Sequence, residues 1–141
     1  MNANIQQRAS LLAEMFIREL NPFFLAQASY QGNRWDYIAT FRTKTNPNLV
    51  ITVDVMGTIV PLRSEFIFPA SPHWVRSLND TSDNLLILVI NVLEDKIYWG
   101  WAKLAAVVRD PSVKGAALVR LPLVESNEAS KAKLLAEIKA R

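Results

Sequence analysis

The stretch from Leu49 to Gly57 reads Leu-Val-Ile-Thr-Val-Asp-Val-Met-Gly. Its β-branched residues are typical of a strand, and we expect a buried strand over 49–55 that Gly57 closes. Strand alternation places Asp54 on the same face as Met56 and opposite the two valines that flank it. Burying an unpaired charge is costly. Asp54 therefore either has a compensating neighbour or lies on a face that meets solvent.

The residues before this strand predict a helix followed by two more strands. An apolar stripe at three- and four-residue spacing indicates an amphipathic helix over 3–20, which Asn21-Pro22 ends. Two runs rich in aromatic and β-branched residues predict strands over 23–30 and 35–43, joined by a turn over 31–34. With the strand over 49–55 they form a three-stranded meander.

The residues after Gly57 predict a second group of elements. Ser71-Pro72 is typical of a capped helix start, and the apolar run 85–92 indicates a central strand covered on both faces. The remaining expected elements are a loop or edge strand over 59–72, a short helix ending near Asn79, a strand over 96–102, a helical turn over 104–108, a strand over 116–124 and a helix over 126–141. This order predicts an α/β or α+β fold in which helices flank a mixed central sheet.

Composition bounds the class of protein. The chain has 141 residues, of which 50% are hydrophobic and 21% charged, and this is typical of one globular domain over 1–141. No apolar run approaches the ~20 residues of a membrane-spanning helix, so we expect no membrane association. The first residues lack the order of a secretory signal, and the absence of cysteine excludes disulfides and thiolate metal sites. We expect a cytoplasmic protein.

Charge and motifs narrow the chemistry. The net charge is +3 and the basic residues are scattered along the sequence. DNA is therefore a possible partner, but the charge pattern does not demonstrate general electrostatic binding of a polyanion. The one histidine, His73, has no second ligand at metal-binding spacing. With four glycines the chain lacks a phosphate-cradling loop. Trp99 and Trp101 share one face of a strand, where they either stack on bases or, as we favour, pack in the core.

Three acidic residues carry a resemblance to a known family. Nucleases of the restriction-endonuclease-like (PD-(D/E)xK) superfamily have a helix with a glutamate, a meander with an aspartate, and an acid two residues before a lysine on the next strand. Glu14 in the first helix, Asp36 at the start of the second strand and Asp54 on the third resemble this pattern. Over residues 5–124 the chain is also similar to the uncharacterised prokaryotic nuclease-like family called domain of unknown function 4365.

One departure from this pattern bears on activity. Met56 stands where the family has its catalytic lysine, and a thioether neither carries positive charge nor donates a hydrogen bond. The resemblance implies that Glu14, Asp36 and Asp54 form a degenerate catalytic site that is able to hold Mg²⁺, which needs only one or two protein carboxylates. No cofactor is certain. Lys44, late in the second strand, is a candidate substitute for the lysine, although nothing in the sequence shows it reaching Asp54.

These observations lead to one hypothesis and two alternatives. The hypothesis is a nuclease-like protein, catalytically inactive or impaired, that acts by binding DNA or a protein partner. The first alternative is an active Mg²⁺-dependent DNA endonuclease that uses Glu14, Asp36 and Asp54 with a displaced lysine. The second is an interaction module that ignores nucleic acid and dimerises through an exposed sheet edge or the C-terminal helix.

Overall fold

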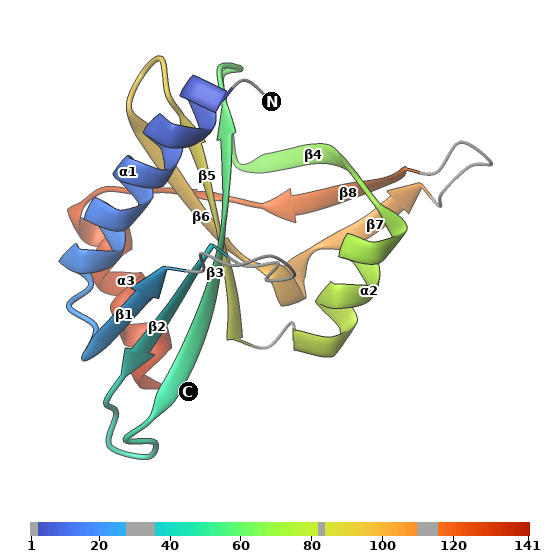
Figure 1. Ribbon diagram of the computed structural model, residues 1–141. Coiled ribbons are helices and arrows are strands. Elements are labelled where there is room, and N and C mark those ends of the chain that lie inside the picture. The colour runs from blue at the N-terminus through green and yellow to red at the C-terminus, as the bar shows by residue number, and fades with distance from the viewer. Residues whose placement is uncertain (1–2, 28–35, 82–83, 110–115) are drawn as a thin grey trace.

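The structure is a computed structural model that describes residues 3–27, 36–81, 84–109 and 116–141. Runs of strands lie between the helices along the chain (Figure 1). Their order is α1 (Ala3–Glu19), β1 (Phe24–Gln27), β2 (Tyr37–Phe41), β3 (Leu49–Thr58), β4 (Glu65–Ala70), α2 (Pro72–Thr81), β5 (Leu85–Asn91), β6 (Lys96–Trp101), the 3₁₀ turn η2 (Ala102–Leu104), β7 (Ala106–Arg109), β8 (Ala117–Pro122), β9 (Val124–Glu125) and α3 (Glu128–Lys139).

The strands form two sheets. The larger has six strands in the order β1-β2-β3-β5-β6-β9, and the smaller has three in the order β4-β8-β7. In the larger sheet β1, β2 and β3 are an antiparallel meander, β5 is parallel to β3, and β6 is antiparallel to β5. The predicted mixed α+β fold with a central sheet flanked by helices is thereby confirmed.

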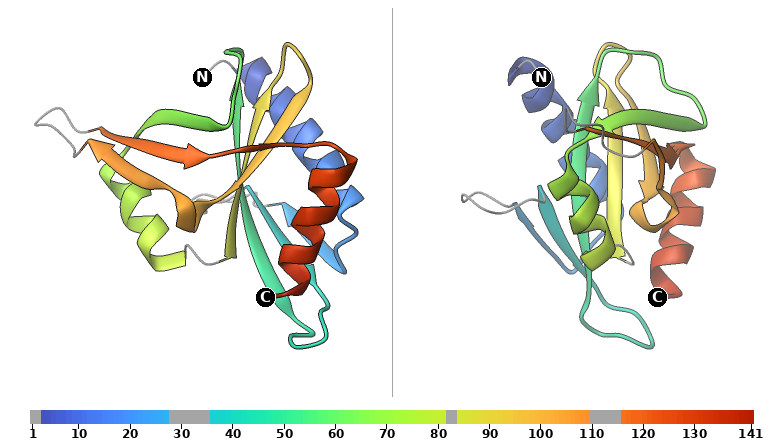
Figure 2. Two further views of the ribbon diagram at one scale, coloured as in Figure 1. Left: turned by 180° about the vertical axis from the view of Figure 1, so that it is seen from behind. Right: turned by 90° about the vertical axis from the view of Figure 1, so that its right-hand side faces the viewer.

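The two faces of the larger sheet are covered differently (Figures 1 and 2). Helices α1 and α3 cover one face, and α2 and the small sheet cover the other. The first core, on the side of α1 and α3, includes Ala13, Phe16, Tyr37, Ile51, Val53, Leu88, Trp99, Trp101, Leu134 and Ile138. The second core, on the side of α2 and the small sheet, includes Phe68, Leu78, Leu85, Ile87, Val89, Tyr98, Val119 and Leu121. Every residue of β5 is buried, which confirms the predicted central strand.

Strand β3 is longer than the sequence indicated. We expected it to end at 55 and Gly57 to close it, but the strand continues to Thr58. A Cβ on Gly57 would lie 2.9 Å from the Cβ of Ala9 on α1. The glycine therefore serves the close approach of the helix to the strand, and it does not interrupt the strand.

Two other expectations were wrong. The helical turn expected over 104–108 is the end of η2 followed by strand β7, because Val107 and Val108 continue a sheet that the local sequence does not reveal. The single strand expected over 116–124 is divided into β8 and β9, which belong to different sheets. The predicted loop or edge strand over 59–72 contains β4, and the turn expected over 31–34 lies outside the described residues.

The tryptophans of β6 are core residues, as expected. Trp99 and Trp101 are 2% and 3% exposed, and the Trp101 indole N–H donates to Glu137 Oε2 of α3 at 3.3 Å. They are therefore not available as stacking platforms for bases. Within the described ranges, none of the helices has the length and apolar character that crossing a membrane requires.

Candidate functional site

Asp36 and Asp54 lie opposite each other on neighbouring strands. Tyr37 pairs with Val53 in the antiparallel ladder of β2 and β3, and the Asp36 N–H donates to the Val53 carbonyl at 2.9 Å. Asp36 is the residue immediately before β2, so this register brings it beside Asp54 of β3. Their side chains are hydrogen-bonded to each other. The sequence placed both residues on the meander, and the fold brings them into contact.

The backbone of β3 holds the Asp36 carboxylate in place. Its Oδ2 accepts a hydrogen bond from the Val55 N–H at 2.7 Å. A backbone donor on a strand cannot rotate away as a side chain can, so the orientation of this carboxylate is fixed by the sheet itself. Asp36 thus presents its remaining acceptor capacity toward Asp54.

Asp54 faces the second core and contacts helix α2. Its neighbour in the ladder on β5 is Ile87, which is fully buried. The Trp74 indole N–H donates to Asp54 Oδ2 at 3.3 Å, and the Trp74 ring packs edge-on against Phe68 with centroids 5.2 Å apart. Asp54 is therefore partly buried among apolar side chains, with the Trp74 indole and the Asp36 carboxyl group as its polar side-chain neighbours.

This environment raises the pKa of Asp54 to about 8. Burial is the largest cause, followed by the negative charge of Asp36 and the hydrogen bond between the two carboxyl groups; the hydrogen bonds from Trp74 and from the Val55 backbone act in the opposite direction. At neutral pH the Asp54 carboxyl group is consequently mostly protonated. Two facing carboxylates that cannot both ionise can share a proton or bind a cation in its place.

Met56 lies on the same face of β3, two residues beyond Asp54. It is partly buried against the second core and neighbours Val89 on β5. Its side chain packs there as an apolar group, so this position gives the carboxylate pair no positive charge. The position at which the sequence departs from the nuclease pattern, Met56, is therefore next to Asp54 on the same face of β3.

Lys44 lies too far away to replace the missing lysine. It is exposed in the connection between β2 and β3, beyond the end of β2 that is opposite to Asp36. The five residues of β2 that separate the two positions span about 16 Å, which is longer than a lysine side chain. The geometry therefore gives no support to Lys44 as a substitute.

Glu14 does not join the two aspartates. It lies on α1, which covers the face of β3 that carries Val53 and Val55, whereas Asp54 points to the other face. Glu14 pairs with Arg18 at 3.7 Å and lines a hollow of about 610 Å³. Across the described part of the chain no three metal-binding side chains come together.

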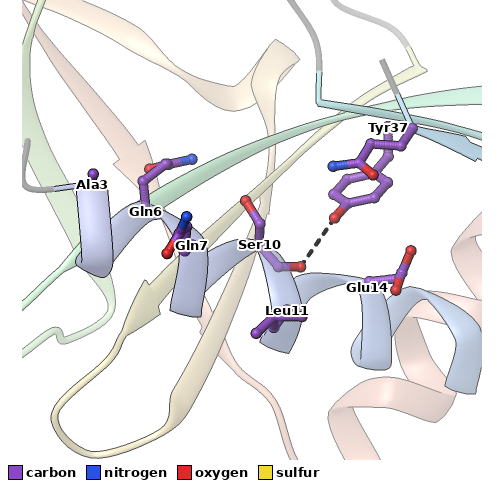
Figure 3. Close-up of a pocket in the computed structure, with 8 residues that line it drawn as sticks. Ala3, Gln6, Gln7, Ser10, Leu11, Glu14 and Tyr37 are labelled. Atoms are coloured by element: carbon purple, nitrogen blue, oxygen red, sulfur yellow. Dashed lines mark hydrogen bonds between the residues drawn. The ribbon is translucent and has the colours of Figure 1, made fainter. Parts of the chain in front are cut away.

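Figure 3 shows the hollow that Glu14 lines. Along α1 the side chains of Gln6, Gln7 and Ser10 precede Glu14, and Tyr37 of β2 points toward the helix, where its hydroxyl donates to the Ser10 carbonyl at 3.1 Å. Burial is the first cause that raises the pKa of Tyr37, and the charge of Glu14 adds to it. Tyr37 thus ties β2 to α1 on the face away from the aspartate pair.

Trp74 is the residue that sequence reasoning missed. The capped start of α2 was visible, and it is present: Ser71 Oγ accepts from the Trp74 N–H at 3.1 Å. The pairing of Trp74 with Asp54, twenty positions earlier, depends on how α2 packs on β3. The one signal for it was a buried acid in need of a donor.

The comparisons with known proteins return no relative. No family model matches the chain, no curated protein is significantly similar to it, and no solved structure matches it significantly. Function is therefore argued from the fold and from the aspartate pair.

Proposed function

We propose that this chain is a restriction-endonuclease-like protein with impaired phosphodiester hydrolysis, which acts by binding DNA. The observation that carries the proposal is the juxtaposition of Asp36 and Asp54 on adjacent strands with Met56 two residues further along the second strand. Two adjoining acids without an ammonium group at Met56 support this proposal, because the resemblance implies a nuclease site that keeps its acids and lacks its lysine.

The arrangement of elements supports this proposal. Helix α1, the meander β1 to β3, helix α2 and strand β5 follow one another in the order that the resemblance implies, around a mixed sheet. Asp36 lies one residue before the second strand of the meander and Asp54 lies within the third. Since a fold alone does not define function, the weight rests on the position of the two acids.

The aspartate pair fits a hard divalent cation. Carboxylate oxygens are the ligands that Mg²⁺ prefers, and one or two of them suffice because the ion keeps several waters. Asp36 and Asp54 would hold the ion, with Val55 and Trp74 orienting the two carboxyl groups. A bound Mg²⁺ would supply positive charge to a phosphate group. The chain itself contributes the two acids and an apolar Met56, and among the residues that the structure describes no ammonium group is seen beside them.

A cleavage assay and a binding assay together test the proposal. We expect wild-type protein to leave supercoiled plasmid intact in Mg²⁺ or Mn²⁺ and to retain a labelled DNA duplex with an affinity that falls as salt rises. Cleavage that disappears in Asp54→Ala would show an active nuclease. Absence of DNA retention at low salt would transfer the proposed binding role to a protein partner.

An exposed sheet edge favours one other candidate, a dimeric interaction module. All four residues of β7 are exposed at the edge of the small sheet, and the neighbouring Leu104 is 56% exposed. Such an edge is able to pair with a second chain. A bulge between Val107 and Arg109 works against this pairing. Sedimentation would support a dimeric interaction module if the wild-type protein were a dimer whether or not DNA is present and the Val107→Lys variant were a monomer.

A further inference from the structure

A second hollow is lined by residues from the end of α1, the connection to β1, the end of β2 and α3. Its volume is about 480 Å³, within the range of about 300–1,000 Å³ that is typical of small-molecule sites. Its accessible apolar lining comes from Phe23, which is 57% exposed, and from the half-buried Pro22 and Leu135. Leu20, Phe41 and Ile138 also line it but are buried in the first core. The hollow therefore offers an apolar floor on the side of the sheet away from the Asp54 carboxylate.

One wall of this hollow is a fixed backbone turn. Asn21 has a φ of 56°, a left-handed conformation that asparagine tolerates better than most residues. The turn redirects the chain from α1 into β1, and the Phe23 N–H donates to the Thr40 carbonyl at 2.7 Å. The adjoining Pro22 has a fixed φ. This wall is held by the backbone and does not depend on side-chain ordering by a ligand.

Arg42 is held at the rim in one orientation. Its Cζ atom lies 3.6 Å from the centroid of the Phe23 ring, so the guanidinium stacks on the aromatic face. Stacking fixes the plane of the group but leaves its N–H edge available, and that edge matches the two oxygens of a carboxylate. Phe23 is 57% exposed and gives Arg42 a platform facing solvent.

The rim has an excess of positive charge. Lys139 also lines the hollow, and among the ion pairs of the described chain none includes Arg42 or Lys139. Glu19, the one acid in the lining, already binds the Lys131 ammonium. An anionic ligand would therefore meet two cations whose charge is not neutralised by a neighbouring carboxylate.

We propose that this hollow binds a small organic anion, with the carboxylate on Arg42 and an aromatic or aliphatic body against Pro22, Phe23 and Leu135. The apolar floor selects the body of the ligand, and the oriented guanidinium selects its charged end. The site is separate from the aspartate pair, so it gives the protein a ligand-binding capacity that does not depend on the proposed nuclease ancestry.

A matched pair of probes tests this proposal. Naphthalene-2-carboxylate and the neutral naphthalene-2-carboxamide share one apolar body and differ at the group that Arg42 would bind. Titrations followed by the backbone amide signals of the protein should give an affinity for the carboxylate about tenfold or more above that for the amide. The largest signal changes should fall on Phe41, Thr43 and Lys139.

Two variants complete the test. Arg42→Gln, at an exposed position, should reduce the preference for the carboxylate to about onefold, whereas Arg109→Gln on β7, also exposed, should leave it unchanged. Circular dichroism would verify that both variants are folded. Equal affinities for the two probes in wild type, an unchanged preference in Arg42→Gln, or signal changes confined to residues outside the hollow would each overturn the proposal.

Discussion

The raised pKa of Asp54 makes the stability of the protein depend on pH in a direction opposite to that of most carboxylates. Its ordinary value is 3.8 and its folded value is about 8. Between these two pH values the folded chain holds one proton more than the unfolded chain. Stability is therefore highest at the acidic end of this window and falls as pH rises, by up to about 1.4 kcal/mol per pH unit.

Asp54→Asn isolates this effect. Asparagine keeps the shape of the side chain and its capacity to accept from Trp74, but it does not titrate. Between pH 5 and pH 7 the wild-type free energy of unfolding should fall by about 2.7 kcal/mol relative to the variant. Because every other carboxylate is common to both proteins, the difference between them removes most of the remaining pH dependence.

Urea unfolding of both proteins at several pH values measures this difference. The free energy of unfolding of Asp54→Asn minus that of wild type should increase steadily from pH 5 to pH 7, while the m-values of the two proteins stay equal. A gap that is constant with pH would show that Asp54 is ionised throughout, and the account of a buried carboxyl sharing a proton with Asp36 would be refuted.

Three further predictions concern the surroundings of this pair. Met56→Lys places an ammonium group beside Asp54, so the pH dependence of the free energy of unfolding should shrink. Mg²⁺-dependent plasmid nicking should also appear, with Met56→Leu as the inactive control. A Met56→Lys protein that folds and keeps the wild-type pH dependence would contradict this placement. Trp74→Phe retains the packing on Phe68 but removes the indole donor, so it should raise the pKa of Asp54 further. Mn²⁺ binding measured by calorimetry at pH 7 should become weaker. Equal Mn²⁺ affinities of the variant and wild type would show that Trp74 does not contribute to the site. Gly57→Ala brings a methyl group within 2.9 Å of Ala9 and should destabilise the fold by about 1–3 kcal/mol in urea unfolding, whereas no loss would mean that α1 moves away freely.

The elements that were predicted well are those whose pattern is local. The stripe of α1 and the apolar run of β5 each carry a period that only one kind of element satisfies, and both are present. The expectation for 104–108 was wrong because β7 is defined by pairing with β8, from residues nine or more positions away. A strand at the edge of a sheet has little periodicity of its own when all its residues are exposed.

The candidate site shows the same division. The sequence left two alternatives for Asp54, a compensating neighbour or a face that meets solvent, since an acid among valines is costly to bury. Its partners could not be chosen from sequence, because Asp36 reaches it through strand register and Trp74 through helix packing. Glu14 has the helical position that the resemblance implies, but the side of the sheet on which α1 packs separates it from the pair.

The free energy of the aspartate pair is the strongest physical reason to look for a ligand there. A neutral residue at Asp54 would satisfy the Trp74 donor without the repulsion from Asp36, and the fold would gain stability at neutral pH. The chain instead carries a buried acid opposite a second acid whose orientation is fixed by the Val55 N–H. A divalent cation would convert that repulsion into attraction and displace the shared proton, so its binding should strengthen as pH rises from 6 to 8. Calorimetric titration of Mn²⁺ across this range, with Asp54→Asn as the control, measures this directly; an affinity independent of pH would mean that the cation binds without engaging the protonated carboxyl, and the pair would then be a cost to stability with no ligand to offset it.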